Sequence, residues 1–329
     1  MEIRIALIIG VVFSLLFFSP IDTSAKSQEN IYVIQAGDAL PDIAKKFETT
    51  VDDLKITNGI QSDIFVVGQR LWVPFSYEVA SGDTLKEIAA QFHSSPELIQ
   101  TSNGLSSDQV IPGQVLKIVP KKMNMHEEHI LMTKEEFKDW LMNQKIKRKI
   151  SLIQQHHTWV PDYNRVNFSN HFALLTGMEN YHKNTMGWKH IAQNITTFPD
   201  GKLAVSRPLY IAPEGTIGSK ANSVGIAIEH VGNFDIGHDV MTKEQSDTII
   251  YVNAVLSLKF GLTPSIDTIT YHHWWDLRNG ERVLDKGPDY NVKTCPGTGF
   301  FGGNSTTSAQ KYFYPLITKK MEELQKEMD

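Results

Sequence analysis

Apolar and polar positions in the first third of the chain repeat at a fixed interval of 45 residues. In each copy an alternating stretch predicts a short strand and a Gly-Asp pair predicts a turn. Apolar residues at helical spacing (Leu40, Ile43 and Phe47 in the first copy) then predict a helix, and a second helical piece ends at Asn-Gly. A final strand closes each unit, which is therefore strand, helix, helix, strand. The matching residues are Tyr32, Gly37, Asp38, Leu40, Ile43, Ala44, Phe47, Asn58, Gly59, Gly68, Gln69 and Leu71 in the first copy, and Tyr77, Gly82, Asp83, Leu85, Ile88, Ala89, Phe92, Asn103, Gly104, Gly113, Gln114 and Leu116 in the second.

From residue 131 the pattern changes to helices that alternate with strands. Thr133 and Glu136 form a capping-box pair that predicts a helix to about Asn143. This alternation predicts an α/β domain over residues 131–329, with a mixed sheet and flanking helices. Further helices are predicted at about 167–181 and 242–260, and strands at 150–155, 204–211, 224–231 and 268–272.

The two copies, residues 31–74 and 76–120, resemble the LysM carbohydrate-binding module over their whole length. The second copy is nearer the usual form, since the first has Ala39 where the second has Thr84. The resemblance implies that each module holds glycans containing N-acetylglucosamine in a shallow groove, although the same glycines and asparagines also suit ordinary turns. Two weak sites in tandem imply a repeating polymer as ligand. The residues implied at or near the grooves are 37–40 and 58–60 in the first copy and 82–85 and 103–105 in the second.

Residues 1–25 have the features of an export signal. Arg4 precedes an apolar stretch that ends at Phe18, and small residues follow to Ala25, after which we expect cleavage. The apolar stretch of about fourteen residues is shorter than the roughly 18 that a membrane-spanning helix needs. We therefore expect a secreted, cell-wall-associated protein without a stable membrane anchor.

Residues 121–130 are charged and lack periodicity, so we expect a solvated linker there. This segment contains His126-Glu127-Glu128-His129, which invites a metal interpretation. The spacing differs from the His-Glu-x-x-His pattern of zinc peptidases, and no later partner in the sequence supports a metal site. The linker interpretation is preferred.

Composition narrows the class of protein further. Of the 329 residues, 41% are hydrophobic, which suits one enzyme-sized domain with smaller modules. The formal net charge of −5 and the lack of basic runs interleaved with aromatics argue against nucleic acid as a partner.

The chain has one cysteine, Cys295. A lone thiol in a secreted chain has no internal disulfide partner, which leaves a surface position, an intermolecular bridge or a metal ligand.

Two histidine pairs provide candidate ligands that could bind a metal ion together with Cys295. His156-His157 ends an apolar run, and His272-His273 precedes Cys295 by about twenty residues. Two imidazoles and one thiolate make a three-ligand zinc site with an open fourth position, as catalytic zinc requires. Adjacent strand residues point to opposite faces, so one histidine of each pair should face the site. The residues alone leave open which one.

Seven short motifs resemble the zinc-dependent N-acetylmuramoyl-L-alanine amidases of the type 2 family, which also includes the peptidoglycan-recognition proteins. The resemblance covers roughly residues 150–300, and its specificity lies in the order and spacing of the motifs. They are Gln155-His156-His157-Thr158, Gly187-Trp188-Lys189-His190-Ile191-Ala192, Asp200-Gly201, Arg207-Pro208, Ser223-Val224-Gly225-Ile226, Tyr271-His272-His273 and Lys293-Thr294-Cys295-Pro296-Gly297.

The resemblance implies a zinc hydrolase of peptidoglycan, with His156, His272 and Cys295 as metal ligands. Zinc with two neutral imidazoles and one thiolate keeps a net positive charge, which favours ionisation of bound water near neutral pH. The implied reaction is cleavage of the amide between N-acetylmuramic acid and L-alanine of the stem peptide. Lys293 matches the cation that stabilises the oxyanion in this family.

The general base is the point at which the chain departs from the family. Members use a tyrosine after the Gly-Trp motif or a glutamate after Ser-x-Gly-Ile, where this chain has Gln193 and Ala227. Glu229 lies two residues beyond Ala227 and therefore on the same face of the predicted strand. We assign the base to Glu229.

Two other functions stay open. The missing tyrosine and glutamate are compatible with a catalytically inactive protein that binds peptidoglycan. A zinc endopeptidase acting inside the stem peptide would use a comparable metal site, but its usual His-Glu-x-x-His or terminal His-x-His pattern does not occur in the sequence. We predict the amidase, acting as a monomer with peptidoglycan as its partner.

Overall fold

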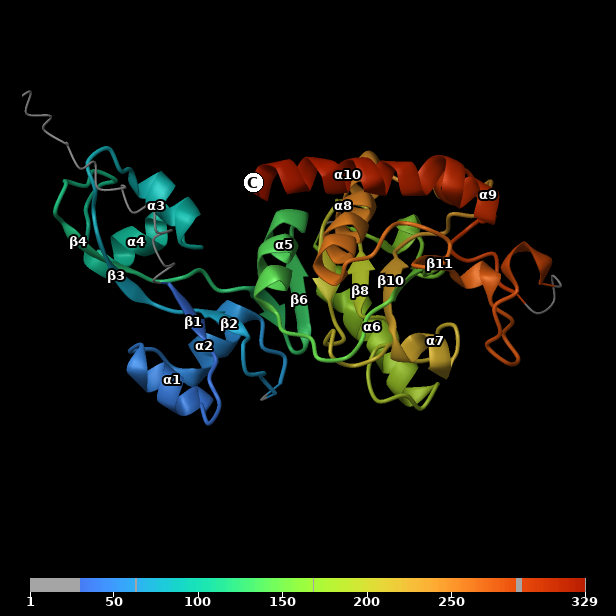
Figure 1. Ribbon diagram of the computed structural model, residues 1–329, viewed down its shortest axis with the longest axis horizontal. Helices are drawn as coiled ribbons and strands as arrows, with labels where there is room; N and C mark the ends of the chain where they lie inside the picture. Colours follow the sequence, from blue (N-terminus) through green and yellow to red (C-terminus); the bar gives the residue numbers. More distant parts are fainter. Residues whose placement is uncertain (1–29, 63, 168, 288–291, 329) are drawn as a thin grey trace, which may run out of the picture.

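The computed structural model describes residues 30–62, 64–167, 169–287 and 292–328. The predicted export signal lies outside the described residues. Two small modules occupy one end of the molecule and a larger α/β domain the other (Figure 1). No helix in these ranges is both long and apolar enough to cross a membrane.

Both small modules have the predicted strand, helix, helix, strand order, and in each the two strands pair antiparallel. Each module has its own apolar core, built around Leu40, Ile43 and Leu71 in module 1 and around Leu85, Ile88 and Leu116 in module 2. Module 1 consists of β1 (Ile31–Val33), α1 (Leu40–Lys46), α2 (Val51–Asn58) and β2 (Arg70–Trp72). Module 2 consists of β3 (Phe75–Glu78), α3 (Leu85–Gln91), α4 (Pro96–Asn103) and β4 (Val115–Ile118).

The difference between Ala39 and Thr84 in the two copies has a local structural consequence. Thr84 begins α3 with a complete capping box, because its hydroxyl accepts from the Glu87 amide while the Glu87 side chain accepts from the Thr84 amide. Ala39 makes no such bond, and α1 instead has a proline in its first turn. The first helix of module 1 therefore begins without a side-chain cap.

The larger domain is built on a seven-stranded mixed sheet with the order β11-β7-β10-β8-β9-β6-β5. The four strands from β11 to β8 are parallel and the remaining pairs are antiparallel. The predicted mixed sheet with flanking helices is thereby confirmed. The strands are β5 (Asn124–His126), β6 (His129–Met132), β7 (Leu152–His157), β8 (Ile195–Thr197), β9 (Leu203–Val205), β10 (Gly225–His230) and β11 (Ile269–Tyr271).

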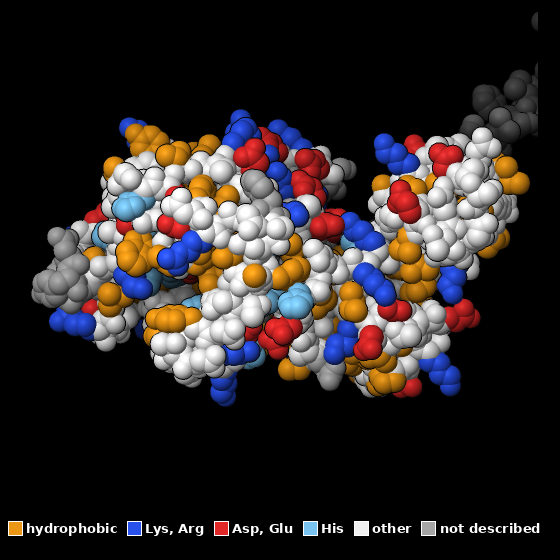
Figure 2. All heavy atoms as spheres, turned by 180° about the vertical axis from the view of Figure 1, so that it is seen from behind, with side chains coloured by type: hydrophobic (Ala, Val, Ile, Leu, Met, Phe, Trp, Pro, Cys, Tyr) orange, Lys and Arg blue, Asp and Glu red, His pale blue; other side chains and the backbone are white. Residues whose placement is uncertain are grey.

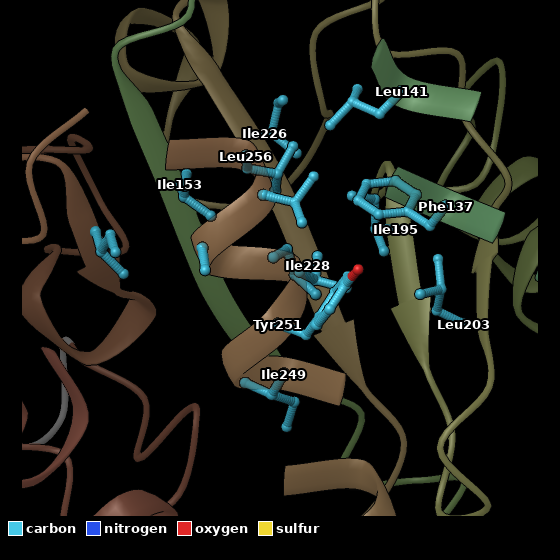
Figure 3. Close-up of a cluster of buried hydrophobic side chains, with 14 of the residues drawn as sticks. Phe137, Leu141, Ile153, Ile195, Leu203, Ile226, Ile228, Ile249, Tyr251 and Leu256 are labelled. Atoms are coloured by element: carbon cyan, nitrogen blue, oxygen red, sulfur yellow. The ribbon is translucent and has the colours of Figure 1, made fainter. Parts of the chain in front are cut away.

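Helices cover the two faces of the sheet. On one face α5 (Lys134–Asn143) and α8 (Lys243–Phe260) pack on the apolar side chains of the central strands, and α10 (Tyr314–Met328) lies over α8 (Figure 1). Figure 3 shows this core, in which Phe137 and Leu256 of the helices cluster with Ile153, Ile195 and Ile228 of the strands. On the other face α6 (His171–Asn184) packs through Leu175. The short helices α7 (Ser219–Ser223) and α9 (Thr306–Ser308) complete the domain.

The expectation of a solvated linker at 121–130 is wrong. Residues 124–132 form the hairpin β5–β6, which extends the main sheet through the pairing of β6 with β9. The cause is the apolar run from Ile130 to Met132, which is buried throughout and follows a fully buried His129. Charged residues at the hairpin turn concealed a strand that belongs to the core of the larger domain.

Other boundaries differ from the sequence prediction in smaller ways. The strand expected at 204–211 ends at Val205, and the chain then turns. His272 lies beyond β11, in a 3₁₀ turn over His272–Trp274, and not in the strand. The capping box at Thr133 and the glycine stop at Gly261, which has a positive φ of 66°, are as predicted. The long helix α10 had no counterpart in the prediction.

Module 1 is docked on the larger domain, whereas module 2 contacts module 1. The indole of Trp140 donates a hydrogen bond of 3.1 Å to the carbonyl of Asn58, and the hydroxyls of Ser62 and Tyr210 lie 2.6 Å apart. Between the modules, the rings of Trp72 and His93 stack with centroids 3.8 Å apart. Figure 2 accordingly shows module 1 continuous with the larger domain and module 2 as a lobe that stands further off.

A matched pair of glycines tests this asymmetry. Gly59 and Gly104 occupy equivalent positions and both have a positive φ, 59° and 62°. An added Cβ at Gly59 would lie 2.7 Å from the Trp140 Nε1, whereas at Gly104 it meets nothing within 4 Å. We expect Gly104→Ala to cost about 1–2 kcal/mol of stability through backbone strain alone. Gly59→Ala should cost about 1–3 kcal/mol more, because the interface must open.

The measurement is chemical or thermal unfolding of the two variants beside the unaltered chain. Equal losses of stability would contradict a docked module 1, because the backbone strain is common to both glycines. An additional early transition in Gly59→Ala, with the larger domain unaffected, would support undocking.

Candidate metal centre

A cavity of about 960 Å³ opens between the sheet and α6. The ends of β7 and β10 supply its floor, and the loop after residue 292 supplies one side. Its lining includes every residue of the predicted site, together with an apolar rim. The lining residues are His156, His157, Thr158, Trp159, Val160, Pro161, Arg165, Ala173, Leu174, Gly177, Met178, Tyr181, His182, Met186, Trp188, Ala192, Gln193, Gly215, Thr216, Glu229, His272, Lys293, Thr294 and Cys295.

Three side chains from separate parts of the chain converge in this cavity. The Nδ1 atoms of His156 and His272 lie 3.1 Å apart, and the Cys295 Sγ lies 3.7 Å from the His156 Nδ1. Tetrahedral zinc with ordinary bond lengths would separate two nitrogens by about 3.3 Å and a nitrogen from a sulfur by about 3.6 Å. All three residues are buried. The donor set therefore fits one zinc ion.

The surroundings of these side chains suit metal binding as well. The His156 Nε2 lies 3.3 Å from the side-chain oxygen of Gln154, which also accepts from the Thr216 hydroxyl. A carbonyl oxygen at the second ring nitrogen fixes the tautomer of a metal-binding histidine. The amide of His157 points to the Cys295 Sγ at 3.3 Å. A sulfur that accepts an amide hydrogen bond is better able to carry negative charge.

Burial sets the protonation of the three groups. Burial and the neighbouring His272 lower the pKa of His156 well below its usual range, and burial with Lys293 lowers the pKa of His272 to about 3. Both imidazoles are thus neutral at pH 7, the form that binds metals. Burial and the Glu229 carboxylate raise the pKa of the Cys295 thiol well above its usual range. A thiolate there needs a cation beside it, which a metal ion would be.

The second histidine of each pair is engaged elsewhere. The His157 Nδ1 accepts a hydrogen bond from the Phe234 amide at 3.1 Å. The His273 Nδ1 lies 2.6 Å from the Lys293 carbonyl oxygen, to which it donates. For His156 and His157 the separation follows from strand alternation, as expected. For His272 and His273 it follows from the 3₁₀ turn that begins after β11.

The two residues expected to act in catalysis lie in the same cavity. Glu229 of β10 is the direct register partner of His156 on β7, and parallel neighbours project to the same face. Burial raises the pKa of the Glu229 carboxyl to about 7, against the opposing effect of Lys293. Lys293 is exposed at the mouth of the cavity. The structure thus puts one acid–base group and one cation beside the three donors.

The two positions at which the resemblance implied a tyrosine or a glutamate also fall in this region. Gln193 is buried, lines the cavity and donates from its amide to the Thr196 hydroxyl at 2.9 Å. Ala227 is fully buried on β10, two residues before Glu229. Neither side chain can take up a proton.

Sequence reasoning missed the apolar rim of the cavity. Trp159, Val160, Tyr181 and Met186 are each between 45 and 60% exposed and lie around its opening. Large exposed apolar side chains at a cleft indicate a binding surface. The signal available in the sequence was Trp159-Val160 directly after the His-His-Thr motif.

Comparison with known proteins bears first on the small modules. The family model described as LysM domain matches residues 32–74 and 77–119. Both copies of the repeat are therefore LysM domains, as their resemblance predicted.

One curated protein is similar to part of the chain. A human protein named N-acetylmuramoyl-L-alanine amidase is 29% identical over 85 residues, which are 26% of this chain and 14% of that protein. The chain thus matches only a small part of that relative's length. With the LysM matches, this confirms the resemblance inferred from the motifs: a domain of the amidase and peptidoglycan-recognition type after two LysM modules.

Several solved structures with related names match about half of the chain. The N-acetylmuramoyl-L-alanine amidase LysC from Clostridium intestinale is 19% identical, with a TM-score of 0.35, and the match covers 53% of this chain and 87% of that one. Drosophila PGRP-LB is 17% identical, with a TM-score of 0.38, and the match covers 52% and 85%. Peptidoglycan recognition protein-LE, in complex with tracheal cytotoxin, is 15% identical, with a TM-score of 0.39, and the match covers 51% and 84%.

The metal site can be tested through its sulfur ligand. A chain reconstituted with Co²⁺ should show the absorption of a cobalt–thiolate bond, because Cys295 is the one cysteine in the sequence. Cys295→Ser should abolish this absorption, whereas His273→Ala should keep it. Persistence of the absorption in Cys295→Ser, or its loss in His273→Ala alone, would contradict the assigned ligands.

Proposed function

We propose that this protein is a secreted, zinc-dependent N-acetylmuramoyl-L-alanine amidase that cleaves the amide between N-acetylmuramic acid and L-alanine of peptidoglycan. LysM modules and a domain of the amidase and peptidoglycan-recognition type support binding or hydrolysis of peptidoglycan. The observation that carries the step to hydrolysis is the convergence of His156, His272 and Cys295 in a cavity that also contains Glu229 and Lys293. A recognition surface needs none of these five groups in one place.

His156, His272 and Cys295 would hold the zinc ion. When bound, zinc supplies Lewis-acid chemistry that polarises the scissile carbonyl and makes water more nucleophilic near neutral pH. The chain's own residues have the remaining tasks: to orient the substrate, to move a proton and to stabilise negative charge.

Glu229 is suited to the proton transfers. Burial raises the pKa of the Glu229 carboxyl, and a carboxylate made more basic in this way would accept a proton from water and return it to the departing amine. The Lys293 ammonium, which lines the same cavity, would stabilise the oxyanion on the former carbonyl oxygen. The apolar rim, with Trp159 and Tyr181, would hold the lactyl and peptide parts of the substrate.

A second function has a specific observation in its favour. With Gln193 and Ala227 where amidases of this family have a tyrosine or a glutamate, a peptidoglycan-binding protein without catalysis would look much like this chain. The expected LysM contacts and the apolar rim would serve such a protein equally well. The three metal donors favour the enzyme, because a binder has no need of an open zinc position.

Digestion of purified peptidoglycan with the zinc-loaded chain, followed by mass spectrometry of the products, decides between these functions. The amidase predicts free stem peptides that begin with L-alanine, beside glycan with intact lactyl groups. Peptides cut internally would make the protein an endopeptidase. Binding to the wall with no released product would make it a binder and overturn the proposal.

The assignment of Glu229 is tested by Glu229→Gln, with Glu322→Gln at an exposed position of α10 as the matched control. Loss of the general base should lower the rate constant for cleavage by about 10²-fold or more. The cobalt–thiolate absorption should remain, because a neutral amide of the same size leaves the three donors untouched. Full activity of Glu229→Gln would assign the proton transfer to another group, and loss of the absorption would mean that the change acts on the metal site instead.

A further inference from the structure

A second cluster of metal-binding residue types lies at the junction of the β5–β6 hairpin with α6. The hairpin contributes Glu127, Glu128 and His129, α6 contributes Glu179, and the loop after α6 contributes His190. These residues come from three separate parts of the chain. The cavity of the first metal centre contains none of them.

The distances in the cluster are short. The His129 Nε2 lies 3.3 Å from a carboxylate oxygen of Glu179, and the donor atoms of Glu127, His129 and Glu179 all lie within 4.8 Å of one another. A second triad of Glu128, Glu179 and His190 has the same property. Glu179 is common to both triads.

His129 is the unusual member. Its side chain is completely buried, yet neither ring nitrogen has a hydrogen-bond partner among the described residues. The 3.3 Å approach to Glu179 lacks the geometry of a hydrogen bond. A buried imidazole without such a partner destabilises the folded state, because it has lost its hydrogen bonds to water. Binding of a metal ion at a ring nitrogen would offset this loss.

The net negative charge of the cluster also favours a bound cation. Three carboxylates gather here, those of Glu127, Glu128 and Glu179, and Lys183 lies 2.7 Å from the Glu179 oxygen that is not the one beside His129. Burial lowers the pKa of His129, although the carboxylates oppose this, so the ring keeps a lone pair and adds no positive charge. A divalent cation would neutralise the surplus negative charge.

We propose that His129, Glu179 and Glu127 bind a divalent transition-metal ion of the zinc class, at a site separate from the one formed by His156, His272 and Cys295. One imidazole and two carboxylates suit Zn²⁺ or Mn²⁺, whereas Ca²⁺ and Mg²⁺ prefer oxygen ligands alone. The burial of His129 selects its triad over the one that contains His190, whose side chain is 28% exposed.

Such an ion would hold a wall of the cavity in place. Glu179 lies on α6, and the neighbouring Met178, Tyr181 and His182 of that helix line the cavity. The ion would tie this helix to the β5–β6 hairpin at the edge of the sheet. Its role is therefore structural, and the proposal stands whether or not the protein is an amidase.

The experiment is titration of Zn²⁺ by calorimetry into the full chain carrying Cys295→Ser and His156→Ala, which leaves the first centre with one ligand. We expect one ion to bind. Adding His129→Ala or Glu127→Gln should weaken binding by more than the roughly 10–100-fold that loss of an outer-shell contact causes. His190→Ala, which removes a neighbouring histidine outside the triad, is the matched control and should keep the affinity.

Folding is checked by the unfolding temperature. Zn²⁺ should raise it in the background chain and in His190→Ala, because the ion binds the folded state, and should leave it unchanged in Glu127→Gln. Glu127 is exposed at a turn, so its replacement does not threaten the core. A background chain that binds no Zn²⁺, or binding as tight in the Glu127→Gln and His129→Ala variants as in the background, would overturn the proposal. Loss of binding in His190→Ala alone would overturn the assigned ligands.

Discussion

The parallel pairing of β7 with β10 is the constraint on which the site depends. Six consecutive residue pairs are in register, from Leu152 with Gly225 to His157 with His230. On one face this pairing lines up Ile153 with Ile226 under α8, and on the other it lines up His156 with Glu229. A slip of one residue would turn every side chain of the shifted strand to the opposite face. The buried apolar face therefore fixes the register, and the register fixes the relation between metal donor and carboxylate.

Much of this arrangement was predictable because it follows from local patterns. The 45-residue repeat predicted both LysM modules, and the capping box at Thr133 predicted the start of α5. Strand alternation was enough to select Glu229 as a group facing the site, although no pattern could predict its pairing with His156. The prediction failed for the segment at residues 121–130, because contacts with distant parts of the chain determine its structure. His129 is polar and lies in a charged stretch, but its surroundings are the distant Glu179 and the apolar strand that it begins.

The two LysM modules show how one sequence pattern can serve in two environments. Their matched residues form the same fold, yet Gly59 lies against Trp140 of the larger domain and Gly104 faces open space. The resemblance to LysM places residues 58–60 and 103–105 near the glycan grooves. On that expectation, docking would cover part of the groove of module 1 and would leave the groove of module 2 open at Gly104.

The cluster around His156 and the cluster around His129 have the same physical character, but only the first could be recognised from the sequence. In both, burial keeps imidazoles neutral and leaves charge or lone pairs that a cation would satisfy. The first is detectable through a rare residue, because a lone cysteine in a chain of 329 residues requires explanation. The second uses only common residue types, and its ligand on α6, Glu179, lies 50 residues after His129. Spacing rules detect ligands on one element, such as two histidines on a helix. Such rules cannot detect ligands that come from a sheet edge and a separate helix. These sites are found only in the structure, from buried side chains that lack hydrogen-bond partners.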